Sequence, residues 1–431
     1  MVRVNKTFCG SDPSWANACV GTNGNPGYKE YSKGFSRAAR VLIDKVLEED
    51  SIEYHIDDFI YPICFNMRHS VELRLKHAIQ MLESLAPYKG QTSQFNFSGS
   101  HDIKNIWCYF KRKSEIFDIR YSEINNRIEP VIMDIADIDP TGQTFRYPKD
   151  NNNIKHLTNT QLINFFTLKS SFTTLEKDLD LLVEMNEFLI REYSLGSFTK
   201  KLSRAELFDI SKKLPNRDLW KNDDFKDVRD NIKKDYSLSG KDFEKAVNII
   251  SHNYEMSPMI NISIDLLGVS VNDIKTFIKI WFDRHERSIS KMQGKKPAND
   301  LMEEVSHSIN ASHESWSSAK EFVTPEIMAG LVSLFYFSYD LEFSELYVER
   351  YSNELKLSEA YFLNDREIKT NFHDLVSKTN ALENIVASLY FLGFLDDAES
   401  IVTDYDFLNQ SPLVKKARSR QLFVKNPAFG Y

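Results

Sequence analysis

The sequence predicts an all-α protein in which an N-terminal four-helix bundle is followed by an α-helical C-terminal region. The 431 residues include only 15 glycines and 13 prolines, which is about half of their usual combined share of roughly 12%. A chain this poor in turn-forming residues favours long, uninterrupted elements over a multi-stranded sandwich or barrel. Apolar residues also recur at spacings of three and four, the period of amphipathic helices.

The first helix is expected to begin at Lys29, after an irregular arm over residues 1–28. The arm contains the turn-rich stretch GSDPSWANACVGTNGNPG and shows no periodicity. From Lys29 on, apolar side chains repeat at helical spacing, namely Tyr31, Phe35, Ala38, Ala39, Leu42, Ile43, Val46 and Leu47. This spacing gives the helix one apolar face that must pack on a neighbour.

Two further helices are expected to follow within the next hundred residues. Pro62 suits the first turn of the second helix, which continues to a stop at Pro87. A polar loop separates it from the third helix, for which Ser100 is a suitable N-cap. The third helix carries Ile103, Ile106, Trp107 and Phe110 on its apolar side.

The fourth helix of the predicted bundle is reached through an irregular connection. Residues 139–142 have the composition of a tight turn, and residues 145–148 (Phe-Arg-Tyr-Pro) that of an extended segment. The fourth helix is predicted from about residues 158–160 to just before Gly196. Four amphipathic helices over residues 29–195 indicate a helical bundle as the first domain.

The second domain, residues 196–431, has shorter and more charged segments. Helical patterns are found over residues 242–252, 271–290, 299–322, 325–337, 340–355 and 380–403. No repeat of fixed period is present, so a solenoid is not indicated, although paired helices could stack loosely in that manner. The domain boundary is placed near residue 196, where the segments become shorter and more charged.

Composition excludes several functional classes. The formal net charge of −8 argues against a dedicated nucleic-acid coat, although not against a local basic site. Four cysteines are too few for a disulfide framework and lack the spacing of a zinc site. No signal peptide and no membrane span are indicated. We therefore expect a cytoplasmic protein with no metal, no cofactor and no membrane contact.

Polar residues concentrate on one face of the second helix. At 100° per residue, Arg68, His69, Glu72 and Lys76 fall within about one quadrant. Two pairs, Arg68–Glu72 and Glu72–Lys76, have the i,i+4 spacing of helical ion pairs. A salt-bridged exposed face, or a buried polar network that fixes helix register, explains this spacing without any ligand.

This constellation also resembles a known superfamily. The second helix reads His-Ser-Val-Glu-Leu-Arg-Leu-Lys up to Lys76, and His101-Asp102 opens the third helix with Ser-His-Asp-Ile-Lys-Asn-Ile. Together with Arg146 in Phe-Arg-Tyr-Pro, these motifs resemble prokaryotic members of the HEPN superfamily over residues 29–195. The resemblance implies a helical bundle that binds or acts on RNA or a nucleotide, in prokaryotic antiviral defence or a toxin–antitoxin-type system. HEPN-like bundles often pair, so it also implies a homodimer.

The chain departs from the RNA-cleaving members of that superfamily. Those members resemble one another in an Arg-x(4–6)-His motif near the last bundle helix, where Arg and His suit metal-independent cleavage. No His follows Arg191 at that distance, and no Arg precedes His156 at that distance. One pair, Arg366 and His373, matches the motif but lies outside the bundle. About one such match is expected by chance in this chain. An enzyme of this kind would be a metal-independent endoribonuclease, but its catalytic residues are not assigned by this motif.

The remaining candidates for phosphate contact are Arg68, His69, His101 and Arg146, with Glu72, Lys76 and Asp102 in the same constellation. Guanidinium and imidazole groups both bind phosphate, and Arg does so bidentately. Two basic stretches, residues 104–127 and 415–425, could add contacts or could be solvated surface. The alternative function is a non-catalytic helical scaffold or adaptor that docks a protein partner through the C-terminal half.

Overall fold

The computed structural model describes residues 5–48, 55–92, 94–150, 152–292, 314–424, 426 and 429–431. These residues form helices and loops and no β-strand, so the chain is all-α as predicted. By internal contacts the chain divides into two compact units, residues 1–191 and 192–431. Among the described helices, none has the length and apolar character needed to cross a bilayer.

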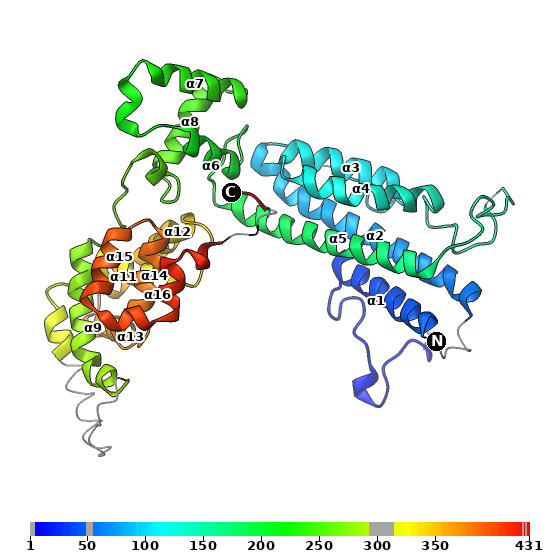
Figure 1. Cartoon of the computed structure of the whole chain (residues 1–431). Coiled ribbons are helices and arrows are strands. Elements are labelled where there is room, and N and C mark those ends of the chain that lie inside the picture. Colours follow the sequence, from blue (N-terminus) through cyan, green and yellow to red (C-terminus); the bar gives the residue numbers. More distant parts are fainter. Residues whose placement is uncertain are drawn as a thin grey trace. The chain divides into compact units, whose positions relative to one another are not determined.

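Unit 1 is a bundle built around two 30-residue helices. Figure 1 shows α2 and α5 running alongside one another, with α3 and α4 on one side and α1 on the other. The bounds are α1 (Tyr28–Leu47), α2 (Ile56–Leu85), α3 (Ile103–Phe117), α4 (Tyr121–Ile138) and α5 (Phe165–Ser194). Residues 5–27 form the irregular arm, which includes one short turn of 3₁₀ helix at Ser14–Ala16.

The predicted count of four bundle helices is one too low. The third predicted helix corresponds to α3, and α4, which follows after the short turn at Asp118, was not predicted. Helix α4 contains Pro130 in its interior, and a proline in a helical pattern normally marks a helix end. Helix α2 likewise begins at Ile56 and takes Pro62 inside it, not in its first turn as predicted.

The fourth predicted helix begins later than expected. Helix α5 starts at Phe165, and residues 158–164 precede it as an irregular segment. The chain bends at residues 140–142, near the predicted turn, and Gly142 has a positive φ of 79°. The prediction of an extended segment over residues 145–148 is wrong, because residues 144–146 form a turn in which the N–H groups of Arg146 and Tyr147 donate to Gln143 at 3.1 Å. The long connection from Asp139 to Asn164 is therefore ordered loop for its described residues, and it lies at the end of the bundle where α2 and α5 begin (Figure 1).

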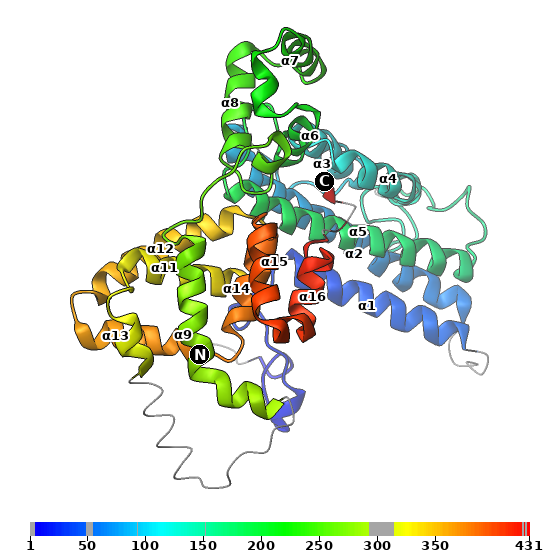
Figure 2. The same cartoon turned by 60° about the vertical axis from the view of Figure 1, so that its left-hand side comes forward.

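The described residues of unit 2 form two hydrophobic cores. The smaller core unites α6 (Arg204–Lys213), α7 (Asp224–Asp235) and α8 (Gly240–Ser251). The larger core contains α9 (Val271–Met292), α11 (Pro325–Phe337), α12 (Glu345–Tyr361), α13 (Asp365–Val376), α14 (Ala381–Phe391), α15 (Leu395–Asp404) and α16 (Pro412–Arg418). All residues of α14 except Glu383 are buried, and this helix packs against α11, α15 and α16 (Figure 2).

Several predicted helices of unit 2 are present with shifted bounds. The pattern over residues 380–403 is two helices, α14 and α15, because Gly393 adopts a positive φ of 89° between them. The pattern over residues 340–355 corresponds to α12, which starts at Glu345. Residues 299–313 of the predicted helix 299–322 lie outside the described residues.

Candidate functional site

The polar face of α2 is buried in the bundle. The side chains of Arg68, Glu72 and Lys76 are 3%, 4% and 5% exposed, respectively. Glu72 accepts from both cations: Lys76 Nζ lies 2.9 Å from Oε1, and Arg68 Nη1 contacts Oε2. Burial alone would raise the pKa of Glu72, but the hydrogen bonds from Lys76 and Arg68 outweigh it and hold this pKa below its usual value. Glu72 is therefore a carboxylate neutralised from two sides.

Arg68 also binds the backbone of two other segments. Its Nε donates to the carbonyl oxygen of Asp139 at 3.2 Å, and its Nη2 donates to Pro140 at 2.8 Å and to His101 at 2.5 Å. Gly142 belongs to the same turn, and a Cβ placed there would lie 3.3 Å from Arg68 Nη1. One guanidinium thus joins α2 to the turn at residues 139–142 and to the residues that open α3.

These contacts favour the buried-network interpretation of the Arg68–Glu72–Lys76 face. A guanidinium whose donors already bind protein oxygens has little left for a ligand. His101 lies at the exposed margin of this network, with Nδ1 3.1 Å from Glu72 Oε1 and a side chain that is 59% exposed. Asp102 caps α3 by accepting from the backbone N–H of Asn105 at 2.8 Å, which is a structural role.

His69 and Arg146 meet at a different place, the ring of Phe65. The His69 ring is stacked on Phe65 at 5.6 Å and lies edge-on to Phe35 at 4.4 Å. Burial lowers the pKa of His69. The Arg146 guanidinium lies over Phe65 at 5.6 Å and over Tyr147 at 5.2 Å, while the residue itself remains exposed. Of the four predicted phosphate contacts, Arg68 and His101 therefore share Glu72, and His69 and Arg146 share Phe65.

Arg146 lines an open groove of about 870 Å³ at the end of the bundle. We call it the Arg146 groove. Its lining includes a second cation and an imidazole, Lys155 and His156, and two tyrosines, Tyr61 and Tyr147, each of which is 48% exposed. Thr158, Thr160 and Gln161 add side chains that can donate or accept hydrogen bonds.

A small backbone motif brings the two sides of the groove together. Lys149 and Lys155 form an isolated antiparallel bridge, and the His156 N–H donates to the carbonyl oxygen of Pro148 at 3.2 Å. His156 Nε2 is buried and has no hydrogen-bond partner among the described residues. Since buried polar atoms are normally paired, this nitrogen marks a position that a bound group could complete.

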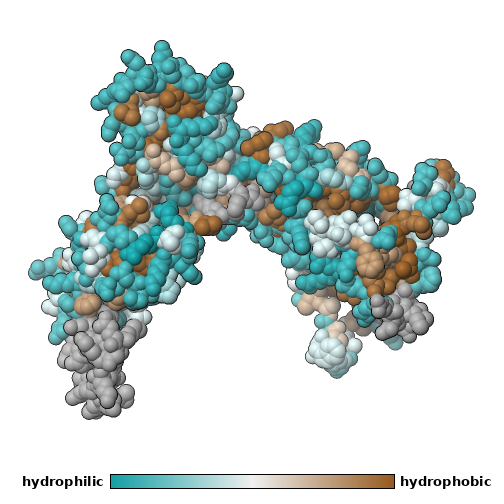
Figure 3. Space-filling view, in the orientation of Figure 1, coloured by the Kyte–Doolittle hydropathy of each residue, from teal (hydrophilic) through white to brown (hydrophobic). Residues whose placement is uncertain are grey.

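Apolar side chains surround the same end of the bundle. Figure 3 shows them gathered where α2 and α5 begin. Leu162 is 93% exposed, Phe166 70%, Ile154 62% and Ile56 50%. Exposed apolar surface that adjoins polar residues is typical of an interaction site.

Tyr61, Lys155 and His156 were not candidates on sequence grounds. They lie almost a hundred residues apart in the chain, and no spacing rule relates them. The available signal was the connection itself, a long irregular segment that contains basic and aromatic residues between two strongly periodic helices. Long ordered loops of this kind often carry function.

The two basic stretches are partly neutralised by acidic neighbours. In the first, Lys111 pairs with Glu129 at 2.6 Å, Arg120 with Asp118 at 2.8 Å, and Arg127 with Asp178. In the second, Arg418 binds Glu399 through two nitrogens, each at 2.8 Å. Arg366 lies at the start of α13, as its position in a polar helix start suggests. The Arg120–Asp118 pair is buried, and the other pairs lie at partly exposed helix surfaces.

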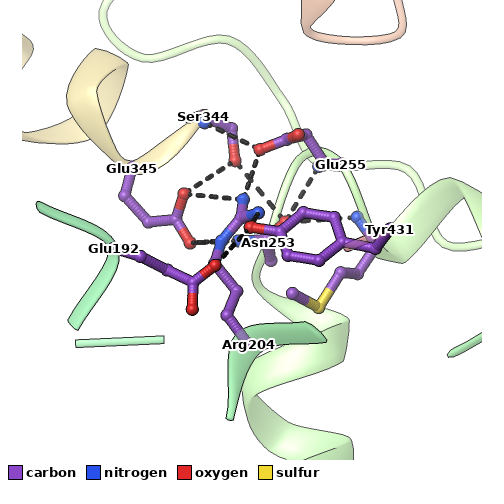
Figure 4. Close-up of polar contacts among 8 residues, drawn as sticks. Glu192, Arg204, Asn253, Glu255, Ser344, Glu345 and Tyr431 are labelled. Carbon is purple, nitrogen blue, oxygen red and sulfur yellow. Dashed lines mark hydrogen bonds and ion pairs between the residues drawn. The ribbon is translucent and has the colours of Figure 1, made fainter. Parts of the chain in front are cut away.

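Unit 2 holds a second buried ionic cluster, centred on Arg204 (Figure 4). The Arg204 side chain is 0% exposed. It binds Glu345 through Nε at 2.8 Å, contacts Glu255 through Nη2, and donates from Nη1 to the Tyr431 hydroxyl at 2.7 Å. Burial would lower the pKa of Arg204, but Glu255 and Glu345 hold it above its usual value. This cluster fastens α6 to α12 and to Tyr431, and its donors are already used.

Among the described residues, no group of three or more His, Cys, Asp or Glu side chains could hold a metal ion. Comparisons of the chain with family models, with curated proteins and with solved structures found no match.

Proposed function

We propose that this protein binds single-stranded RNA through the Arg146 groove. The observation that carries the proposal is the convergence of Arg146, Lys155 and His156 with Tyr61 and Tyr147 around one open groove. The resemblance to HEPN bundles supports RNA as the ligand and a role in prokaryotic antiviral defence or a toxin–antitoxin-type system. The same resemblance supports a homodimer.

The groove supplies both kinds of contact that single-stranded nucleic acid requires. Cations bind the phosphates, and exposed rings stack on the bases. Arg146 and Lys155 provide the first, and Tyr61 and Tyr147 the second. The threonine and glutamine side chains of the lining could bond the ribose 2′-hydroxyl, the group by which a protein distinguishes RNA from DNA.

The buried network of α2 supports this function indirectly. Arg68 holds the turn at residues 139–142, only a few residues before Arg146 in the chain. Thr144 continues this order, since its N–H donates to Asp139 Oδ1 at 3.1 Å. In this proposal Arg68, Glu72 and Lys76 position the loop, whereas Arg146 and Lys155 contact the ligand.

The test is fluorescence polarisation with labelled U12 and A12 RNA at 50 and 200 mM salt. Arg146→Gln/Lys155→Gln is compared with Lys104→Gln/Arg112→Gln, which removes the same charge from exposed positions of α3 outside the groove. We expect the first variant to bind at least about 10-fold more weakly. Because each phosphate contact on a single strand contributes about 0.7 to the logarithmic salt slope, that slope should fall by about 1.4.

The matched control should keep the affinity and the salt slope of the unchanged protein. Equal losses in both double variants would show a diffuse charge effect and contradict the groove. Absence of RNA binding at 50 mM salt would contradict the function itself. Gel analysis of the same reactions in EDTA reports whether bound RNA is cut without a metal, the activity expected of an RNA-cleaving HEPN bundle.

A further inference from the structure

A second cavity lies within unit 1 and is lined by residues of α2, α4 and α5. It has a volume of about 320 Å³, which is roughly twice that of an engineered apolar cavity that binds benzene. Phe145 and Thr160 line both this cavity and the Arg146 groove. We call it the α2–α4–α5 pocket.

The interior of the pocket is apolar. Its buried lining comes from α2 and α5, namely Cys64, Met67, Phe172 and Leu175. Helix α4 adds one half-buried stripe at helical spacing, namely Val131, Ile135 and Ile138. Burial and the charge of Asp139 raise the pKa of the Cys64 thiol to about 12, so this thiol is uncharged. Walls of this kind favour the hydrophobic part of a ligand.

The rim of the pocket is polar. Four lining residues are exposed, namely Asp134, Asn164, Thr167 and Ser171. The amide oxygen of Asn164 is already used, since it accepts from the Thr167 N–H at 3.0 Å. Asp134 forms no hydrogen bond and no ion pair with any described residue. Its carboxylate is therefore free to bind a ligand at the rim.

The neighbouring charges leave this carboxylate unbalanced. Arg68, Glu72 and Lys76 together carry one positive charge, and the buried carboxylate of Asp139 offsets it. Arg68 lines the pocket, but four of its five N–H groups already bind protein oxygens. Asp139 Oδ2 has no partner among the described residues. The charge that remains is that of Asp134, and it attracts a cation and repels a carboxylate.

We propose that the α2–α4–α5 pocket binds a small apolar molecule that ends in a protonated amine. The apolar body lies between Met67, Ile135 and Phe172, and the ammonium group binds Asp134 at the rim. A primary ammonium has three N–H donors, and the hydroxyls of Thr167 and Ser171 offer further acceptors there. This site does not depend on the proposed binding of RNA.

The test is saturation-transfer NMR with the full-length protein and three probes that share one apolar body: 4-phenylbutylamine, 4-phenylbutanol and 4-phenylbutyrate. We expect the amine to bind about threefold to fivefold more tightly than the alcohol, as an exposed ion pair would allow. The carboxylate should bind most weakly. Asp134→Asn should remove the preference for the amine. Asp137→Asn, an exposed position of α4 outside the pocket, should keep it.

A second pair of variants tests whether the probes occupy this pocket. Ser171→Trp places a large ring at the rim and should abolish binding of all three probes. Ser170→Trp, at the adjacent exposed position outside the lining, should leave their affinities unchanged. All four substituted positions are exposed, so the variants should fold normally, and circular dichroism melting verifies this.

Five outcomes overturn the proposal. No probe binds at 5 mM, or the carboxylate binds as tightly as the amine. Asp137→Asn weakens binding of the amine as much as Asp134→Asn does, which would show a diffuse charge effect. Ser171→Trp leaves binding intact, which would place the probes elsewhere. Adenosine binds more tightly than the amine, which would make the pocket a base-binding extension of the Arg146 groove.

Discussion

At the scale of single residues, Arg68 binds four other residues through one side chain. It neutralises Glu72 and supplies donors to the carbonyl groups of His101, Asp139 and Pro140. Without Arg68, the carbonyl oxygens of His101 and Asp139 would lose their described partner, whereas that of Pro140 would keep the Ile103 N–H at 2.9 Å. A buried pair of this kind adds little net stability over an apolar replacement, but breaking it on one side is strongly destabilising.

Arg68→Met should therefore lower the free energy of unfolding by about 3–5 kcal/mol, because it leaves Glu72 buried with only Lys76 as a cation. The double variant Arg68→Met/Glu72→Met should recover part of that loss. Urea unfolding followed by circular dichroism measures both. Arg37→Met, at an exposed position of α1, serves as control. If Arg68→Met cost no more than this control, the network would be irrelevant to the fold.

Buried histidines predict a dependence of stability on pH. Burial lowers the pKa of His285, whose Nε2 lies 2.9 Å from the carbonyl oxygen of Val376, and it lowers that of His69 as well. The unfolded chain, with a histidine pKa of about 6.5, then binds more protons than the folded one just below that pH. The free energy of unfolding should thus fall as the pH decreases through 6.5.

His285→Gln keeps a hydrogen-bond donor and removes the titration. Its free energy of unfolding should decrease less than that of the unchanged protein between pH 7.5 and 5.5, by up to about 1 kcal/mol. Urea titrations at the two pH values measure this difference. An identical pH dependence in His285→Gln would refute the assignment.

At the scale of elements, the unexpected helix is α4. Pro130 removes one backbone donor from its interior, and its ring crowds the preceding turn. The helix nevertheless forms because Tyr121, Ile124, Ile128 and Ile132 bury one side of it completely or almost so. Tertiary packing has here overridden a local preference, which is the usual reason that such a helix is missed.

Pro130→Ala should therefore stabilise the protein. Residue 130 is exposed, so alanine restores a backbone donor without disturbing the core. We expect a gain of up to about 3 kcal/mol in the free energy of unfolding. Asn126→Ala, at another exposed position of α4, controls for helix propensity and should gain only about 0.5 kcal/mol. A loss of stability in Pro130→Ala would mean that the ring itself makes a needed contact.

The elements that could be predicted are those with long, regular apolar patterns. The period along α1 and α2 predicts both helices, because each buries a continuous stripe. The first and last residues of each helix are harder to predict, since they depend on capping side chains and on the elements that pack against the helix ends. Helix α5 begins at Phe165, where Asn164 is its N-cap, since Asn164 Oδ1 accepts from the Thr167 N–H at 3.0 Å. The start was predicted too early, at residues 158–160, because threonines there are also favoured caps.

The candidate site was only partly predictable for a related reason. The constellation on α2 was recognisable because its members share one helix, and the structure brings Arg68, Glu72, Lys76 and His101 together. Whether a candidate residue belongs to the buried network or to the exposed groove depends on how α3 and the turn at residues 139–142 cover α2. No local sequence pattern shows such long-range packing. The sequence alone therefore could not show that Lys155 and Tyr61 lie in the same groove as Arg146.

At the scale of the whole molecule, an acidic chain carries small regions of opposite character. The net charge is −8, yet the Arg146 groove holds two cations beside exposed tyrosines. An acidic total suppresses non-specific attraction of polyanions, so binding depends on local geometry.

The Arg204 cluster predicts an effect on the elements that meet at it, which are α6, α12 and, through Glu192, the last turn of α5. The Tyr431 hydroxyl donates to Glu192 at 2.7 Å while it accepts from Arg204, and its ring stacks on Phe208 at 4.6 Å. Tyr431→Phe keeps the ring and leaves these polar groups short of one partner, which should cost about 1–3 kcal/mol. Hydrogen exchange followed by mass spectrometry should show faster exchange in α6 and α12 and no change in α2.

Tyr31→Phe, an exposed tyrosine of α1, is the control and should leave exchange unchanged throughout the chain. Faster exchange in α2 as well as in α6 would show that the effect is not confined to these elements. Unchanged exchange in α6 and α12 would show that the hydroxyl contributes nothing.

The separation between Arg68 and Arg146 has an evolutionary consequence. The residues that hold the loop are shielded inside the bundle, and those proposed to touch a ligand project from it. Substitutions at Arg146, Lys155 or Tyr61 can therefore alter what is recognised while the bundle keeps its stability. A protein built in this way can change its target through a few surface mutations and inherit the same framework each time.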